Sequence, residues 1–187
     1  MEICNEGVRT KRVFEKHKEY VDDLLGRYLE KRSALLPLLN LAQREEGYVS
    51  ETAMKEIARI LDLTPSQVYE TATFYTMLNL KPIGKFHIQV CKSLMCGLIG
   101  SDPLIEWLKK HLDIPVGGTT VDGLFTLSAV ECLGSCGTGP MMQVNDDYYE
   151  HLTEEKVGKI VGDLKRDGTS PHKSGPFLYP MPAPFPE

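Results

Sequence analysis

Residues 84–91 of the chain are Gly-Lys-Phe-His-Ile-Gln-Val-Cys. Apolar and polar residues alternate strictly through this segment, and a period of two predicts a β-strand with one apolar face. His87 belongs to the other, polar face, so we expect it at the surface. The strand runs directly into Cys91, and Cys96 follows after four intervening residues. The segment therefore predicts a strand with a pair of cysteines at its end.

A second pair of cysteines follows a second predicted strand in the same way. Residues 125–130 form that strand, and Cys132 and Cys136 come directly after it. Because loops at neighbouring strand ends can converge, the two pairs are expected to form one site with four sulfur ligands. Glycines surround both pairs: Gly97, Gly100, Gly134, Gly137 and Gly139.

Four thiols in two loops are compatible with several kinds of site. A [2Fe–2S] cluster takes two cysteines on each iron, and glycine backbone can wrap closely around it with N–H groups directed at sulfur. Structural zinc sites use closer C-x-x-C spacing but stay an alternative, as do thiol chemistry and a [4Fe–4S] centre. Both loops lack the histidines of a Rieske centre, and the chain has no C-x-x-C dithiol. The residues favour a cluster and leave zinc and thiol chemistry open.

Composition indicates a globular protein and excludes some classes of partner. The chain has 187 residues, of which 42% are hydrophobic and 25% charged, with a net charge of −5. This charge gives no basic footprint for nucleic acid, and no apolar run approaches the roughly 20 residues that span a bilayer. The N-terminus shows no secretory signal, so we expect a reducing compartment, where cysteine pairs bind metal more often than they form disulfides.

The first half of the chain predicts a compact helical unit. Amphipathic periodicity indicates helices over residues 17–31 and 33–46, and Ser50 can cap a third helix. The segment 64–67, Thr-Pro-Ser-Gln, has the signature of a capping box and begins a fourth helix that should end before Pro82.

The second half predicts a sheet with flanking helices, and so an α+β or α/β fold. Between the two strands a helix is expected over residues 102–111. A hairpin follows over 141–149 with its turn at Asp146-Asp147, and Thr153 caps a last helix that runs to Leu164. We predict four parts: a tail (1–16), a helical domain (17–81), a sheet domain (82–166) and a Pro/Gly-rich tail (167–187).

Other conspicuous residues have ordinary structural explanations. Cys4 is expected to be an incidental free thiol rather than a fifth ligand. Two further histidines are expected at the surface: His111 and His151. Four apolar residues are predicted to lie in the core: Phe74, Tyr75, Met77 and Leu78. Met141 and Met142 either shield a cluster from water or pack as part of a strand. No phosphate loop, nucleophile elbow or catalytic triad is found, so no substrate site is expected on this chain.

Several motifs together resemble a known family. They are the segments 74–77, 84–91, 130–136 and 145–149, together with Pro140. The motifs are similar to those of the thioredoxin-like [2Fe–2S] subunit of respiratory complex I, the twenty-four-kilodalton subunit family of NADH:quinone oxidoreductase. The similarity covers about residues 20–164. Gly139 stands where this family commonly has alanine.

The resemblance implies a helical N-terminal domain followed along the chain by a thioredoxin-like ferredoxin domain with a four-stranded sheet. It implies an electron-transfer subunit whose cluster exchanges one electron with FMN of an adjacent NADH-oxidising flavoprotein subunit. A large iron–sulfur subunit is the second implied partner, in a proton-translocating enzyme. The implied ligands of the one [2Fe–2S] cluster are Cys91, Cys96, Cys132 and Cys136.

The same resemblance places the chain in the peripheral arm of a membrane complex, without membrane insertion of its own. That arm faces the bacterial cytoplasm or, alternatively, the mitochondrial matrix. Two other functions stay open. The chain could be a diaphorase subunit of an NAD-linked hydrogenase or formate dehydrogenase, since these relatives share the ligand motif. It could also be a non-redox adaptor stabilised by zinc.

Overall fold

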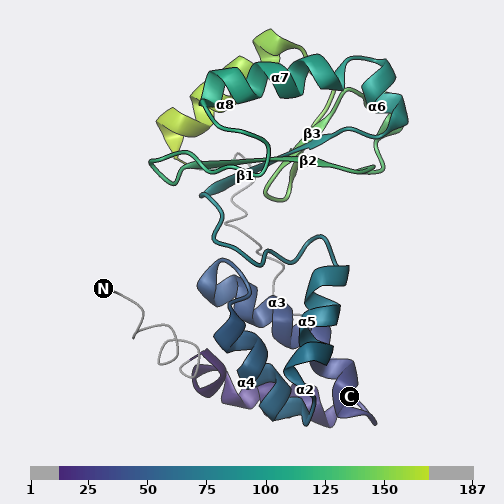
Figure 1. Ribbon diagram of the computed structural model, residues 1–187, viewed down its shortest axis with the longest axis vertical. Helices are drawn as coiled ribbons and strands as arrows, with labels where there is room; N and C mark the ends of the chain where they lie inside the picture. The colour runs from purple at the N-terminus through teal and green to yellow at the C-terminus, as the bar shows by residue number, and fades with distance from the viewer. Residues whose placement is uncertain (1–12, 169–187) are drawn as a thin grey trace. The chain divides into compact units, whose positions relative to one another are not determined.

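The computed structural model describes residues 13–168, which divide into two compact units, one ending at Pro82 and the other beginning at Ile83 (Figure 1). Each unit has its own hydrophobic core. Cys4 and the predicted C-terminal tail beyond Gly168 lie outside the described residues. Within residues 13–168, no helix combines the length and the apolar character needed to cross a membrane.

The first unit is helical, as predicted. Its elements are α2 (Lys18–Gly26), the 3₁₀-helix η1 (Lys31–Ala34), α3 (Leu35–Glu46), α4 (Glu51–Leu61) and α5 (Pro65–Phe74). The predicted caps are present: Ser50 Oγ accepts a hydrogen bond from Ala53 N at 3.1 Å, and Thr64 and Gln67 form the reciprocal capping box. These caps satisfy N–H groups that the first turn of a helix leaves without partners.

Three expectations for this unit were wrong. The helix predicted over residues 17–31 ends at Gly26, where glycine favours a break, and Leu29 is fully exposed. Residues 13–16, predicted as tail, are helical, and Val13 and Phe14 belong to the core. Of the four apolar residues predicted to lie in the core, only Leu78 is buried; the exposed ones are Phe74, Tyr75 and Met77.

The second unit is a four-stranded mixed sheet with helices, which confirms the predicted fold class. Its strands are β1 (Phe86–Cys91), β2 (Phe125–Val130), β3 (Met142–Val144) and β4 (Asp147–Tyr149). Their order in the sheet is β2-β1-β3-β4; β1 and β2 are parallel, and the other pairs are antiparallel. The remaining elements are α6 (Leu94–Leu98), α7 (Ser101–Leu112), η2 (Cys136–Thr138) and α8 (Glu154–Asp167).

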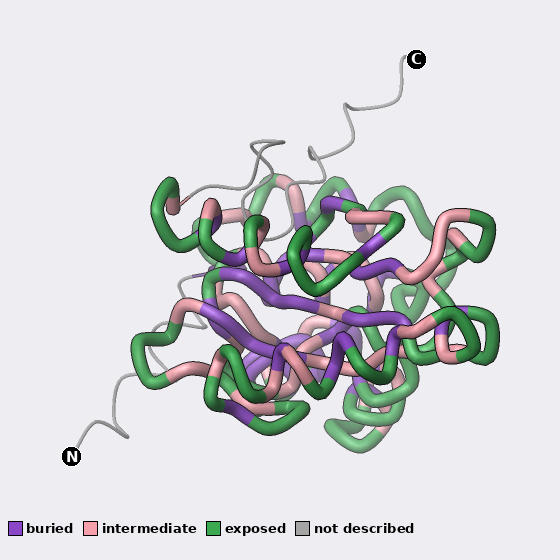
Figure 2. Tube along the Cα trace, turned by 90° about the horizontal axis from the view of Figure 1, so that it is seen from above, coloured by how far each residue is buried: buried purple, intermediate pink, exposed green. Residues whose placement is uncertain are grey.

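The main core of this unit lies between the sheet and two helices. Helices α7 and α8 lie on one face of the sheet (Figure 1). Buried residues follow the strands in Figure 2, and the apolar face of β1 contributes as its alternation predicts. The core residues of β1 and β2 are Phe86, Ile88, Val90, Phe125 and Leu127.

The hairpin turn lies one residue earlier than predicted. Val144 pairs with Asp147, so the turn consists of Asn145 and Asp146. Asn145 has a φ of 54°, which asparagine tolerates better than most residues. Its side chain accepts a hydrogen bond from His87 N at 2.9 Å and donates one to Lys85 O at 3.1 Å. The turn is therefore tied to β1.

The prediction of a surface position for His87 was wrong. The residue is 8% exposed, and its Nε2 lies 2.8 Å from Ser128 Oγ on the neighbouring strand. Burial lowers the pKa of His87 from 6.5 to about 4, because the charged ring loses its hydration. The His87 side chain is therefore largely shielded from water, although it lies on the polar face of β1.

We expect the burial of His87 to make the sheet unit sensitive to acid. As pH falls below 6.5, the unfolded chain takes up a proton that the folded chain binds only near pH 4, so protonation favours unfolding. Between pH 7 and 4.5 the wild type should lose about 2–3 kcal/mol more stability than His87→Gln. Urea unfolding followed by the fluorescence of Trp107, the single tryptophan, measures this difference. Parallel pH profiles for the two proteins would contradict the prediction.

Candidate metal centre

The parallel pairing of β1 with β2 brings both cysteine loops to one edge of the sheet. Cys91, the last residue of β1, lies in register with Val130, the last residue of β2. Lys92 N donates to Val130 O at 2.8 Å, which continues the pairing one residue beyond the strands. Lys92 and Glu131 form an ion pair at 3.4 Å across the two loops. The segments that carry the two cysteine pairs therefore start side by side.

The first pair, Cys91 and Cys96, is buried. Cys91 N donates to Met141 O at 3.2 Å, which ties the end of β1 to the segment before β3. Cys96 lies in α6, a single helical turn where the sequence had predicted only a loop. This turn places Cys96 in the same small packing cluster as Cys91. Gly97 in α6 lowers helix propensity, and Ser93 makes no side-chain cap, so no strong sequence signal announced this helix.

The second pair, Cys132 and Cys136, is exposed. The two sulfur atoms lie 3.6 Å apart, and Gly134 N donates to Cys132 Sγ at 3.3 Å. Gly134 has a φ of 81°, a conformation that glycine adopts without strain, and this lets the loop turn its N–H toward the sulfur. Cys136 begins the short helix η2.

In each cysteine pair one thiol has a raised pKa. Burial raises the pKa of Cys96, and the neighbouring Cys91 thiol raises it further. The Cys132 thiol raises the pKa of Cys136, with further contributions from burial and from Cys91 of the other pair. These effects disfavour negative charge on the sulfur atoms of Cys96 and Cys136, and a bound metal cation would compensate such charge.

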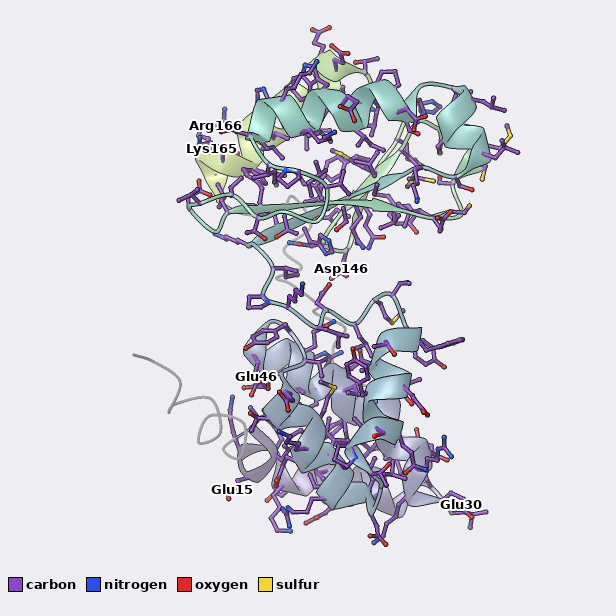
Figure 3. The ribbon with its side chains drawn as sticks, viewed as in Figure 1. Glu15, Glu30, Glu46, Asp146, Lys165 and Arg166 are labelled. Carbon is purple, nitrogen blue, oxygen red and sulfur yellow. The ribbon has the colours of Figure 1, made fainter. Side chains whose placement is uncertain are left out.

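A small packing cluster, separate from the main core, surrounds the buried pair. Met141 is fully buried against Cys91 and Cys96, and Leu133 packs on the same cluster. Met142, by contrast, belongs to the core under α7 and α8. The two methionines thus have the two roles that the sequence left open, one beside the sulfurs and one in the strand. Figure 3 shows sulfur atoms gathered near α6, at the end of the unit opposite Lys165 and Arg166.

The segment from β4 onward holds the second cysteine loop, a role that the sequence did not reveal. Tyr148 Oη donates to Leu133 O at 2.8 Å. The Glu150 carboxylate accepts hydrogen bonds from the Ser135 and Thr138 hydroxyls. His151 N donates to Thr138 O at 2.7 Å. Only the alternation of Tyr148 and Glu150 along the chain, which predicts a shared side of an extended segment, could have suggested this.

In the described part of the chain, no histidine lies in either cysteine loop. His151 is exposed, and His111 is exposed with its ring stacked on Trp107 at 4.4 Å, so the predicted surface positions of these two are confirmed. Within residues 13–168, no three His, Cys, Asp or Glu side chains are arranged to hold a single metal ion. The four thiols are instead grouped as two pairs.

The second unit is a mixed sheet in which two paired parallel strands each lead into a pair of free thiols. Residues 21–165 match the thioredoxin-like [2Fe-2S] ferredoxin family, and the chain belongs to that family. Membership in this family supports one [2Fe–2S] cluster and confirms the expected thioredoxin-like fold.

Relatives within this family belong to an oxidoreductase. A subunit of the NADH-quinone oxidoreductase of Rickettsia conorii is 46% identical over 156 residues, which cover 82% of this chain and 93% of the relative. The corresponding subunit from Rhizobium meliloti is 43% identical over 148 residues, covering 79% of this chain and 88% of the relative. These names agree with the expected electron-transport role.

A solved structure of an NAD+-reducing [NiFe]-hydrogenase in the air-oxidized state has a similar fold. The TM-score is 0.62 with 20% identity, and the match covers 72% of this chain and 23% of the hydrogenase chain. At this identity the similarity concerns the fold alone.

The contact between Gly139 and Ile99 gives a prediction about the site. A Cβ on Gly139 would lie 2.5 Å from Ile99 Cδ1 and 3.2 Å from Cys96 Sγ, so alanine fits only if Ile99 moves. We expect Gly139→Ala to destabilise the sheet unit by about 1–2 kcal/mol, as overpacking does. Ile99→Val removes the clashing methyl group and should recover at least half of this loss.

The double-mutant cycle of Gly139→Ala and Ile99→Val, measured by urea unfolding, checks this prediction. Ile99→Val alone serves as the control, because the Ile99 side chain is half exposed and its shortening should change stability little. Strictly additive effects of the two substitutions would show that Ile99 does not occupy the space of the missing Cβ.

Proposed function

We propose that this chain is the electron-transfer subunit of an NADH:quinone oxidoreductase and that four cysteines hold its one [2Fe–2S] cluster. The proposed ligands are Cys91, Cys96, Cys132 and Cys136. The observation that supports the proposal is that the paired parallel strands β1 and β2 end side by side and that each leads into a pair of free cysteines.

The arrangement of the thiols fits such a cluster. A tetrahedral metal with metal–sulfur bonds of about 2.3 Å holds two sulfurs about 3.8 Å apart. The Cys132 and Cys136 sulfurs, 3.6 Å apart, already have this spacing. Two thiols for each of two metals match the two pairs better than one zinc ion, which needs all four sulfurs around a single point.

The residues around the sulfurs fit an electron carrier. When bound, a [2Fe–2S] cluster takes up and releases one electron without a change of ligands. Met141 and Leu133 keep water from the Cys91 and Cys96 side. Cys132 and Cys136 are exposed, so a redox partner can approach from that side. The Gly134 N–H directed at Cys132 stabilises negative charge on the sulfur.

The relatives support the proposed host and partners. Identities of 43–46% to subunits named for NADH-quinone oxidoreductase favour this enzyme over a hydrogenase, whose similarity is limited to the fold. The proposed electron partner is FMN on an NADH-oxidising flavoprotein subunit, and a large iron–sulfur subunit lies beside it. The chain then belongs to the peripheral arm of a proton-translocating complex, on the cytoplasmic face in a bacterium.

Anaerobic purification followed by absorption and EPR spectroscopy tests the cluster. We expect two irons and two sulfides per chain, a coloured oxidised form, and an EPR signal after reduction with dithionite. Cys132→Ala or Cys96→Ala should lose the cluster and with it the order of the cysteine loops, because metal binding is coupled to folding. Cys4→Ser is the matched control and should leave the visible spectrum unchanged.

Three results would each overturn part of this proposal. A colourless protein with one zinc per chain and no signal after reduction indicates the structural adaptor instead. A bleached Cys4→Ser variant refutes the ligand assignment. Purification of the native complex decides the host, because co-purification with hydrogenase subunits rather than quinone-reducing ones excludes the proposed enzyme.

A further inference from the structure

Glu150 lies at the centre of a polar cluster behind the second cysteine loop. Ser135 Oγ and Thr138 Oγ1 both donate to one oxygen of this residue, Oε1; the distance from Thr138 is 2.5 Å. The two hydroxyls also lie 2.7 Å from each other. Since Ser135 and Thr138 flank Cys136, the carboxylate fixes the short segment that presents this thiol.

The other contacts of this segment come from the same part of the chain. Tyr148 Oη donates a hydrogen bond to the Leu133 carbonyl, and His151 N donates one to the Thr138 carbonyl. Glu150 is the one carboxylate among these groups. Lys156 Nζ also donates a hydrogen bond to the Glu150 backbone carbonyl at 2.5 Å, which helps to hold this residue in place.

The carboxylate is ionised in the folded protein. Hydrogen bonds from Ser135 and Thr138 lower the pKa of Glu150, and the charges of His151 and Lys156 lower it further. A negative charge therefore lies in contact with Ser135, the residue that precedes Cys136.

We propose that Glu150 is a positioning residue for the cluster: it holds the Cys136 segment and lowers the reduction potential through its charge. The inference rests on the proposed function. A negative charge close to a redox centre disfavours the addition of an electron, and the potentials of iron–sulfur clusters respond to local charge and hydrogen bonding. The N–H of Gly134 acts in the opposite sense, because it stabilises the more negative reduced state.

Two variants separate the charge from the hydrogen bonds. Glu150→Gln keeps an oxygen that can accept both hydroxyl hydrogen bonds at the position of Oε1, but it removes the charge. The double variant Ser135→Ala with Thr138→Val keeps the charge but removes both donors. Asp163→Asn is the control, since it removes an exposed carboxylate paired with Arg166, which lies at the end of the unit away from the sulfur atoms (Figure 3).

The midpoint potential, followed by EPR in a redox titration, and the rate of iron release to a chelator are the two readouts. We expect Glu150→Gln to raise the midpoint potential and to leave the release rate within about twofold of wild type. The double variant should release iron roughly tenfold faster, because it loses two hydrogen bonds to a charged acceptor. Asp163→Asn should change neither quantity.

An unchanged potential in Glu150→Gln, or an equal rise in Asp163→Asn, overturns the role of the charge. A release rate like that of wild type in the double variant overturns the holding role. A wild-type chain without a cluster refutes the proposed function instead. In that case hydrogen exchange of the amides of residues 133–138 still tests the holding role, because only the double variant should then lose protection.

Discussion

The parallel hydrogen bonding between β1 and β2 is the interaction on which the rest of the site depends. It puts Cys91 opposite Val130, so two loops separated by more than thirty residues in the sequence begin at one sheet edge. A shift of one residue would turn the apolar residues of β1 away from α7 and α8, so the main core fixes the register. The packing that stabilises the domain therefore also sets the relative position of the two cysteine pairs.

The two cysteine pairs are held in place by different kinds of interaction. Apolar packing fixes Cys91 and Cys96, through Met141 and the single turn of α6. Hydrogen bonds from β4 and the residues after it fix the segment that carries Cys132 and Cys136. The difference follows from solvent access, because an exposed loop cannot gain order from apolar burial and must use directional bonds instead.

Sequence patterns predicted the parts of the structure that depend on local signals, such as the alternation of β1 and the capping box at Thr64. Features set by tertiary contacts could not be predicted in this way. His87 has the pattern of a surface residue, and its burial depends on another strand. Met77 looks apolar enough for the core, but its side chain is exposed, while its backbone carbonyl accepts a hydrogen bond from the buried Gln43 at 2.9 Å. Likewise, the four thiols were evident as a group from their spacing, whereas the role of Glu150 becomes visible only when the hairpin and the loop are seen together.

The separate packing of Cys91, Cys96 and Met141 bears on how the site can be filled. These residues are not part of the core under α7 and α8. The second cysteine loop can therefore open while the sheet stays folded, at a free energy below that of global unfolding. If the four cysteines hold a cluster as proposed, its insertion is a local event in an already folded domain.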